Sequence, residues 1–545
     1  MTGFFKNKAG EQVFILGLQS HNSSDGCWEM IDRSIAAVKL YGGNTLETPI
    51  YWYQVEPEEG VYDFSMLEQL LQRVRNAGLY LVPLWFGFSK NAENTYMPDW
   101  VKADPVRFKW TIGPDGATRA NMSPHDNAVY EADARCFARL MQQIRRLDGD
   151  TGTILTVQVE NEIGLGLFDT DRCYSKQAQR DFELGVPSEL DGVELEGSEA
   201  PGGGSDWYSR FGHFAHEAFT TYYLSRQVER IARAGKAEYD LPLYMNTMVG
   251  EVRQEIAGFS YSSGTPCGRT LDIWRRTAPS IDLYCPDIYQ QDSSGYLRTC
   301  QRHARSDNAL FIPESGTGGI MPAMNMLHAI ADYGAIGVCG FGAEDTLDES
   351  GNLTDAAVPV AESYRACAAI APLILQYRLT PSLFAVTQEE FQPYAYLKLP
   401  NYHMTVHFDY SYSFFGTPAA PTPVRHSNLP RKLGLPEKLG KTVSRGRMLG
   451  VEISPDEYYF SGICCTLRFI KRTDPRQTRP HALYAGKCAN ELSVLSVEEG
   501  HFDKNGRFIV DFVRNGDEIN GGIFVRSGTV THVVFNPMAG TVVDW

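Results

Sequence analysis

The chain has 545 residues, with 50 Lys and Arg against 66 Asp and Glu, and a formal net charge of −16 at pH 7. Its hydrophobic content of 43% and charged content of 21% are typical of a folded globular protein and exclude a collagen-like or disordered chain. Nucleic acids and anionic membrane surfaces are disfavoured as partners because they repel an acidic protein, and no stretch approaches the ~20 apolar residues of a membrane-spanning helix.

Short apolar runs alternate with helical patterns over the first 375 residues. Helices are predicted at 28–41, 65–77 and 128–147, and eight strands at 13–18, 44–51, 79–86, 154–159, 243–246, 281–285, 310–313 and 336–341. Continuously apolar strands between helices indicate a parallel sheet that is buried on both faces. Eight such units, with no G-x-G-x-x-G after any strand, favour a closed (β/α)8 TIM barrel over an open nucleotide-binding sheet.

The pattern changes after residue 375. Residues 376–545 carry short strand-like runs separated by turns, which predict a β-rich accessory domain of the sandwich type. Residues 416–441 are rich in Pro, Gly and basic residues and are predicted to form a long exposed loop. The chain is therefore expected to contain a catalytic barrel at 1–375 and a C-terminal β-sandwich-like domain.

Acidic residues follow the fourth and seventh predicted strands, whose C-terminal ends lie at the active face of a barrel. The fourth strand runs into Glu160-Asn161-Glu162 and the seventh into Glu314. Two carboxyl groups about 5–5.5 Å apart catalyse retaining glycoside hydrolysis, one as the nucleophile and one as the proton donor. A single Glu at a strand end is more often solvated or placed at a helix N-terminus, but Glu-Asn-Glu is more specific because the amide can donate to a sugar 2-hydroxyl.

We predict Glu162 as the acid/base, because it lies further along the strand and nearer the mouth of the barrel than Glu160. Glu160 has the same side-chain parity, so both side chains could project inward. Glu160 is predicted as a partner of the site, more as a member of a buried network than as a direct substrate contact.

Residues 154–164 resemble the Q-V-E-N-E-[YF]-G signature of glycoside hydrolase family 35, the retaining β-galactosidases built on (β/α)8 barrels. Three further regions resemble a bacterial subgroup of that family and its C-terminal domain of unassigned function: 46–60, 84–91 with 98–102, and 497–500 with 515–518. The resemblance implies that Glu162 is the acid/base, Asn161 its substrate-binding neighbour and Glu314 the nucleophile. It also implies that Tyr289 hydrogen-bonds the nucleophile.

The resemblance departs from the family pattern at the third strand. Members that act on galactose usually carry Ala-Glu-Trp there, and this chain is expected to present residues 85–87, Trp-Phe-Gly. We expect a retaining exo-β-glycosidase, first of all a β-galactosidase, acting on oligosaccharides. An exo-β-glucosidase or a β-1,2-glucan-active hydrolase or transglycosylase is the alternative. A non-catalytic sugar-binding protein would leave the two glutamates and the asparagine unexplained.

Further substrate contacts are predicted at strand ends. Trp85, Tyr51 and Phe341 could stack on sugar rings, with core packing as the competing explanation. Asn246 and Lys90 could donate to hydroxyls, or could instead support loops. No His cluster and no C-x-x-C motif is present, so no metal and no cofactor are expected. The N-terminus lacks a secretory signal, which predicts a cytoplasmic protein, and self-association is left open.

Overall fold

The computed structural model describes residues 3–166, 169–198, 203–250, 256–389, 392, 394–408, 445–472, 494–514, 519 and 522–537. The loop predicted at 416–441 and the segment 515–518 lie outside the described residues. The chain divides into two compact units. The first unit contains residues 1–39, 44–317 and 335–352, and the second contains residues 40–43, 318–334 and 353–545.

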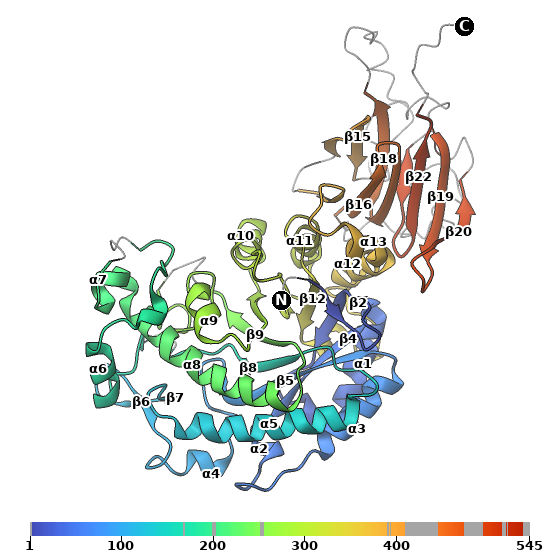
Figure 1. Cartoon of the computed structure of the whole chain (residues 1–545). Helices are drawn as coiled ribbons and strands as arrows, with labels where there is room; N and C mark the ends of the chain where they lie inside the picture. The colour runs from blue at the N-terminus through green and yellow to red at the C-terminus, as the bar shows by residue number, and fades with distance from the viewer. Residues whose placement is uncertain are drawn as a thin grey trace, which may run out of the picture. The chain divides into compact units, whose positions relative to one another are not determined.

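Eight parallel strands form the centre of the first unit (Figure 1). Their order is β11-β10-β9-β8-β5-β4-β3-β12. A parallel bridge between Ile312 and Val338 joins the two ends of this sheet and closes it. The predicted TIM barrel is therefore confirmed. The strands are β3 (Ile15–Gln19), β4 (Thr45–Tyr51), β5 (Tyr80–Lys90), β8 (Val157–Asn161), β9 (Leu243–Met248), β10 (Leu283–Ile288), β11 (Glu314–Ser315) and β12 (Gly337–Phe341).

Helices follow the barrel strands along the chain, and α5 and α8 lie side by side in Figure 1. The longer helices of this unit are α1 (Trp28–Tyr41), α3 (Ser65–Asn76), α5 (Ala128–Asp148), α8 (Ala215–Glu238) and α10 (Ser293–His303). Its shorter helices are α2 (Trp52–Val55), α4 (Asp99–Lys102), α6 (Lys176–Glu183), α7 (Trp207–Phe211) and α9 (Leu271–Thr277). Two small antiparallel pairs complete it: β1 (Phe5–Lys6) with β2 (Gln12–Val13), and β6 (Trp110–Ile112) with β7 (Thr118–Met122).

Two strands extend further toward the C-terminal face than the sequence predicts. β5 continues four residues past Phe86 to Lys90, and β10 continues past Cys285 to Ile288. The extension of β5 ends in Ser89 and Lys90, and that of β10 contains Asp287, so each apolar run is interrupted before the strand itself ends. These two ends carry residues of the candidate site.

The second unit combines three helices with two antiparallel sheets. The helices are α11 (Ile320–Ala331), α12 (Val358–Ala369) and α13 (Ala371–Tyr377). The larger sheet has the order β13-β16-β17-β22-β19-β20 and the smaller one β14-β15-β18-β21. Side chains from both sheets share one hydrophobic core, which confirms the β-rich, sandwich-like fold. The strands are β13 (Leu383–Thr387), β14 (Tyr394–Lys398), β15 (Tyr402–His407), β16 (Arg447–Ser454), β17 (Glu457–Ile463), β18 (Cys465–Lys471), β19 (Val494–Phe502), β20 (Phe508–Val513), β21 (Ile523–Val525) and β22 (Val530–Phe535).

Within the described ranges, no single helix has both the length and the apolar composition to cross a membrane, although the bent pair α12 and α13 meets both criteria when taken together. The cysteines in these ranges are free thiols.

Candidate active site

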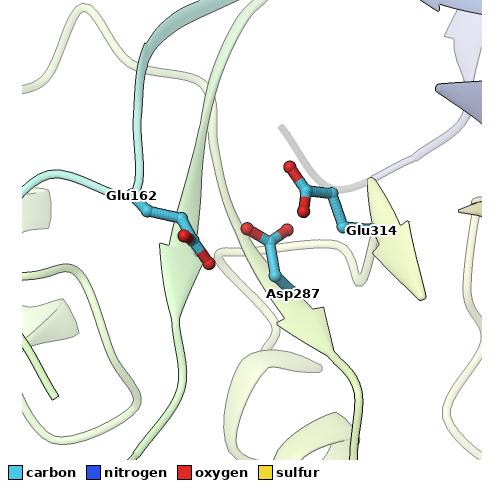
Figure 2. Close-up of side chains that lie close together, drawn as sticks. All are labelled: Glu162, Asp287 and Glu314. Atoms are coloured by element: carbon cyan, nitrogen blue, oxygen red, sulfur yellow. The ribbon is translucent and has the colours of Figure 1, made fainter. Parts of the chain in front are cut away.

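Three buried carboxyl groups meet at the C-terminal ends of neighbouring barrel strands. Glu162 directly follows β8, Asp287 lies in β10 and Glu314 begins β11. One oxygen atom of each lies within 4.8 Å of the others. Figure 2 shows the Asp287 carboxyl between the other two. The three residues are at most 9% exposed, so their charges interact in a poorly solvated environment.

Asn246 of β9 connects the three acidic residues. Its Nδ2 donates to Asp287 Oδ2 at 2.8 Å and to Glu314 Oε1 at 3.3 Å. Its Oδ1 accepts from the backbone N–H of Glu162 at 3.0 Å. One amide therefore fixes the relative positions of all three carboxyl groups.

Four donors surround the carboxylate of Glu314. Tyr289 donates through its hydroxyl at 2.6 Å, and Gln19, Asn246 and Asn161 donate through amide nitrogens at 3.1, 3.3 and 3.4 Å. Hydrogen bonds of this kind stabilise an ionised carboxylate. Glu314 is therefore arranged to carry negative charge, as a nucleophile must.

Lys90 brings a positive charge to the site from the end of β5. Its Nζ donates to Asn161 Oδ1 and to Asn91 Oδ1, each at 2.8 Å. The ammonium group also lies 5.0 Å from the centre of the Phe86 ring, a cation–π distance. The contact with Asn161 holds that amide with its NH2 group toward Glu314.

The electrostatic environment favours a proton on Glu162. Burial raises the pKa of Glu162 to about 7, the negative charge of Glu314 adds to the rise, and the charge of Lys90 and a hydrogen bond with Asp287 oppose it. Burial also raises the pKa of Asp287 well above its usual range, with Glu314 and Glu162 adding to the effect. The arrangement thus presents a protonated carboxyl group beside a carboxylate held by four donors.

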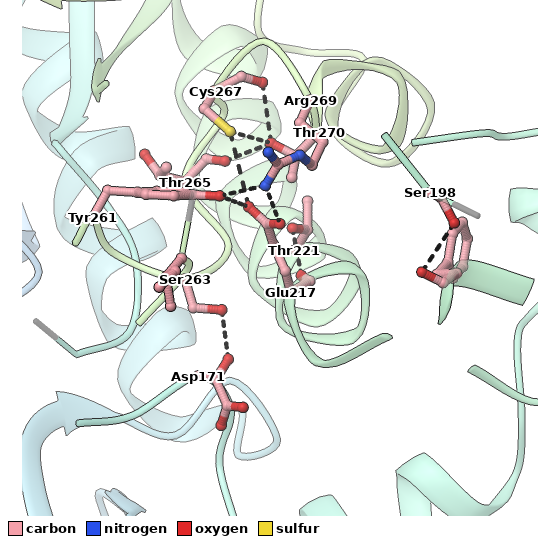
Figure 3. A network of polar contacts seen from close by, with 12 residues as sticks. Asp171, Ser198, Glu217, Thr221, Tyr261, Ser263, Thr265, Cys267, Arg269 and Thr270 are labelled. Carbon is pink, nitrogen blue, oxygen red and sulfur yellow. Dashed lines mark hydrogen bonds and ion pairs between the residues drawn. The ribbon is translucent and has the colours of Figure 1, made fainter. Parts of the chain in front are cut away.

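A second loop supports the segment that follows Glu162. Leu165 exchanges two backbone hydrogen bonds of 2.8 and 2.9 Å with Ser263, in the strap loop (residues 256–270). The strap loop is anchored to α8, as Figure 3 shows. The Tyr261 hydroxyl donates to Glu217 at 2.7 Å and accepts from Arg269 at 2.9 Å. Arg269 and Glu217 form an ion pair at 3.3 Å, and both side chains are 2% exposed.

Comparison with known families agrees with this geometry. Residues 10–199 match the model of glycosyl hydrolases family 35, and residues 360–526 match a domain of unknown function (DUF5597). Residues 10–199 are therefore similar to glycosyl hydrolase family 35. The C-terminal part of the chain is a domain to which no function has been assigned.

Two of the proteins to which this chain is similar are β-galactosidases. β-Galactosidase 14 of Arabidopsis thaliana is 27% identical over 212 residues, which are 37% of this chain and 22% of the relative. The crystal structure of a β-galactosidase from Rahnella sp. R3 has a TM-score of 0.50 at 17% identity. The match covers 70% of this chain and 59% of the Rahnella chain. The catalytic domain of β-amylase from Paenibacillus polymyxa follows at a TM-score of 0.49 and 13% identity, over 64% of this chain and 97% of its own. This chain thus spans less than two thirds of the length of either β-galactosidase.

The structure brings together most of the residues that the sequence places at the site. Glu162, Glu314, Asn161, Asn246 and Tyr289 lie within one connected set of contacts. The roles of these residues in a reaction stay predictions.

Trp85, predicted as a substrate contact, and Glu160, predicted mainly as a buried network partner, both lie toward α5. Trp85 is fully buried on the side of β5 that faces α5, and its Nε1 donates to Asp133 at 2.8 Å. Glu160 points the same way and accepts from the backbone N–H of Ser89 at 2.9 Å, as the buried network partner that the sequence allowed. The positive φ values of Glu160 (58°) and Glu162 (43°) break the strand alternation, so the equal parity of the two residues does not place both side chains inside.

Tyr51 and Phe341 each end a barrel strand, β4 and β12. Tyr51 is 2% exposed and stacks on Tyr96 with a ring separation of 5.0 Å, so it packs within an aromatic cluster and does not present a free face to a sugar. Phe341 meets the His21 ring edge-on at 5.1 Å and is only partly buried. Of these two, Phe341 keeps the exposure that a stacking role requires.

Sequence reasoning missed two residues of the site and misplaced the third strand. Gln19 ends β3, and a search of every strand end for polar side chains would have found it. Sequence reasoning did not identify Asp287 because the strand that became β10 was predicted to stop at Cys285. Lys90, and not the segment 85–87, reaches the site from the third barrel strand, because β5 is longer than its apolar core.

Proposed function

We propose that this protein is a family 35 glycoside hydrolase, a retaining exo-β-glycosidase that removes terminal β-linked galactose from oligosaccharides. The observation that carries the proposal is the approach of Glu162 and Glu314 oxygens to within 4.8 Å. That spacing fits the ~5–5.5 Å of retaining enzymes better than the ~6.5–9.5 Å that leaves room for a water in inverting enzymes. The names of the β-galactosidase relatives support galactose, and the family resemblance supports exo action.

The proposed reaction proceeds in two displacements. Glu162 donates its proton to the glycosidic oxygen while Glu314 attacks the anomeric carbon, so that the leaving group departs as an alcohol and a glycosyl-enzyme forms. Glu162, now ionised, takes a proton from water, and the water oxygen releases the sugar from Glu314 with retained configuration. Asn161 precedes Glu162 in the chain and its amide lies 3.4 Å from Glu314, so it can donate to the sugar 2-hydroxyl.

A second candidate is an exo-β-glucosidase or a β-1,2-glucan-active hydrolase or transglycosylase on the same site. Lys90 favours it, because the third strand presents an ammonium group where galactose-acting members carry the acidic Ala-Glu-Trp segment. The two candidates share the chemistry of Glu162 and Glu314 and differ in the hydroxyl groups that they recognise.

The deciding experiment compares aryl β-galactoside, β-glucoside and β-fucoside with the full chain, and follows the anomer released first by proton NMR. We expect the β-anomer and the highest kcat/KM on the galactoside. Glu314→Gln should retain less than about a hundredth of the wild-type kcat, and Glu162→Ala with azide should form the β-glycosyl azide. Glu68→Gln, on the surface of α3, serves as the control. An α-anomer as the first product would rule out the double displacement.

A further inference from the structure

Asp287 is a third carboxyl group that a two-carboxylate mechanism does not use. It is 2% exposed and lies in β10, in register with Glu314 of β11. Its Oδ2 accepts one hydrogen bond from Asn246 at 2.8 Å, and its Oδ1 accepts none from an N–H group among the described residues. A buried carboxylate with one unpaired oxygen is costly, whereas a protonated carboxyl group can use that oxygen as a donor.

The charges around Asp287 require that at least one proton stay in the site. Glu162 faces it from β8, Glu314 from β11 and Lys90 from β5, while Cys285 and Tyr289 are its titratable neighbours on β10 itself. Three ionised carboxylates against one ammonium group would leave two uncompensated negative charges in a poorly solvated space.

Unequal hydrogen bonding indicates which group keeps the proton. Glu314 accepts from four donors, and one of them is a hydroxyl at 2.6 Å. Asp287 accepts from one. Glu162 must give up its own proton in each cycle of the proposed reaction. Asp287 is therefore the carboxyl group that stays protonated.

We propose that Asp287 is a positioning residue that stays protonated through the catalytic cycle and donates a hydrogen bond to Glu162 whenever Glu162 is ionised. The inference rests on the proposed function. No proton leaves Asp287: Glu162 loses its proton to the glycosidic oxygen and regains one from water, while the O–H bond of Asp287 remains intact. The hydrogen bond stabilises the Glu162 carboxylate at the stage at which it has no other proton nearby.

The direction of the pKa changes agrees with this role. Burial and the charges of Glu314 and Glu162 raise the pKa of Asp287 well above its usual range, and the hydrogen bond from Asp287 lowers the pKa of Glu162. A neutral donor beside Glu162 therefore makes it a stronger acid than burial alone would allow.

Two variants of the full chain separate the protonated state from the ionised one. Asp287→Asn keeps a neutral N–H donor, so kcat/KM should stay within about tenfold of wild type and the basic limb of its pH profile should not move. Asp287→Leu removes the donor, so the basic limb should move up by about one pH unit. If Asp287 is ionised in the native enzyme, Asp287→Asn removes a negative charge beside Glu162 and moves the basic limb down, which overturns the inference. Asp32→Asn, on the surface, is the control for loss of a carboxylate.

Infrared spectroscopy tests the same point without any activity. The difference spectrum between wild type and Asp287→Asn at neutral pH should contain the C=O stretch of a protonated carboxyl group, and its absence would contradict the inference even if no glycoside is cleaved. The melting temperature of the full chain should be the same in EDTA, in Mg²⁺ and in Ca²⁺. A rise with a cation that disappears in Asp287→Asn would show that a cation, and not a proton, balances the three carboxyl groups. Loss of activity on every glycoside with the infrared band present would refute the proposed function alone.

Discussion

Two glutamates of the site differ in charge because their neighbours differ. Glu314 accepts four hydrogen bonds, which favour its carboxylate form, whereas burial beside Glu314 favours a proton on Glu162. Two substitutions test this difference.

Tyr289→Phe removes the shortest hydrogen bond to Glu314 without changing the ring. A hydrogen bond to a charged group contributes about 1.5–3 kcal/mol, so we expect kcat/KM on an aryl β-glycoside to fall by roughly 10- to 150-fold. Steady-state kinetics at a single pH measure the effect, with Tyr62→Phe as a matched control outside the site. More than half of the wild-type kcat/KM in Tyr289→Phe would show that the hydroxyl does not stabilise the carboxylate during the reaction.

The charge of Lys90 should set the upper pH limit of activity. Glu162 must be protonated to act as the acid, and its pKa is about 7, so kcat/KM should fall as the pH rises through about 7. Lys90→Met removes a positive charge that favours ionised Glu162, so the pKa of Glu162 rises and the basic limb moves to higher pH. Lys90→Arg keeps the charge and should leave the limb near its wild-type position. A limb that moves down in Lys90→Met would contradict the assignment of the limb to Glu162.

Among the elements, the strap loop and β8 hold Glu162 from two sides. The strap loop pairs with Leu165 beyond Glu162 and is fixed to α8 by the buried Glu217–Arg269 pair. On the other side, Glu160 is fixed next to Asp133 of α5. The position of Glu162 thus depends on contacts that contain no substrate-binding group.

Arg269→Met should remove the charged group that faces buried Glu217 at 3.3 Å, at a cost of about 3–5 kcal/mol in the free energy of unfolding. The double variant with Glu217→Gln should lose less than the sum of the two single losses, because neither charge then remains. Urea denaturation measures both. Arg146→Met is the control, since its pair with Glu68 is exposed and should contribute less than about 1 kcal/mol. Additive losses would show that the two side chains do not stabilise each other.

The Asp133–Glu160 pair should make stability depend on pH. Burial raises the pKa of Asp133 from 3.8 to about 6, so the folded protein binds this proton more tightly than the unfolded chain does. Its contribution is complete below pH ~4 and is lost as the pH rises through about 6, with a slope of at most about 1.4 kcal/mol per pH unit. Asp133→Asn should flatten the free energy of unfolding between these limits in urea titrations. An unchanged slope would mean that Asp133 does not hold the proton.

On the scale of the whole molecule, the helices that follow the last two barrel strands belong to the second unit. α12 packs on β16 and β17. Arg447 of β16 is fully buried and donates to Ser363 at 2.7 Å and to the carbonyl of Pro359 at 2.6 Å, both in α12. The second unit therefore contains helices that follow barrel strands in the sequence.

A chain truncated after residue 375 should not fold as an independent barrel. It would keep α12 but lose the sheet that covers this helix and the buried partner of Ser363. We expect aggregation or a broad unfolding transition with strong binding of a hydrophobic dye, whereas the full chain should unfold cooperatively. A monomeric truncated chain with a melting temperature near that of the full chain would contradict the expectation.

The sequence was sufficient for the barrel, because its strands are apolar on both faces and α1 begins and ends at the predicted residues. It also placed Glu162 and Glu314 at facing strand ends. It did not predict that β5 and β10 continue past their apolar runs. Asp287 and the position of Lys90 at the site were therefore missed. The orientation of Glu160 depends on a positive φ that no residue pattern of Glu-Asn-Glu indicates.

Asn246 has a consequence for anyone who seeks to redesign substrate choice in this enzyme. Since one amide contacts Glu314, Asp287 and the backbone of Glu162, substitutions among these four residues will not combine as independent contributions. Changes in specificity are better sought outside this jointly held set, for example at Phe341 at the end of β12.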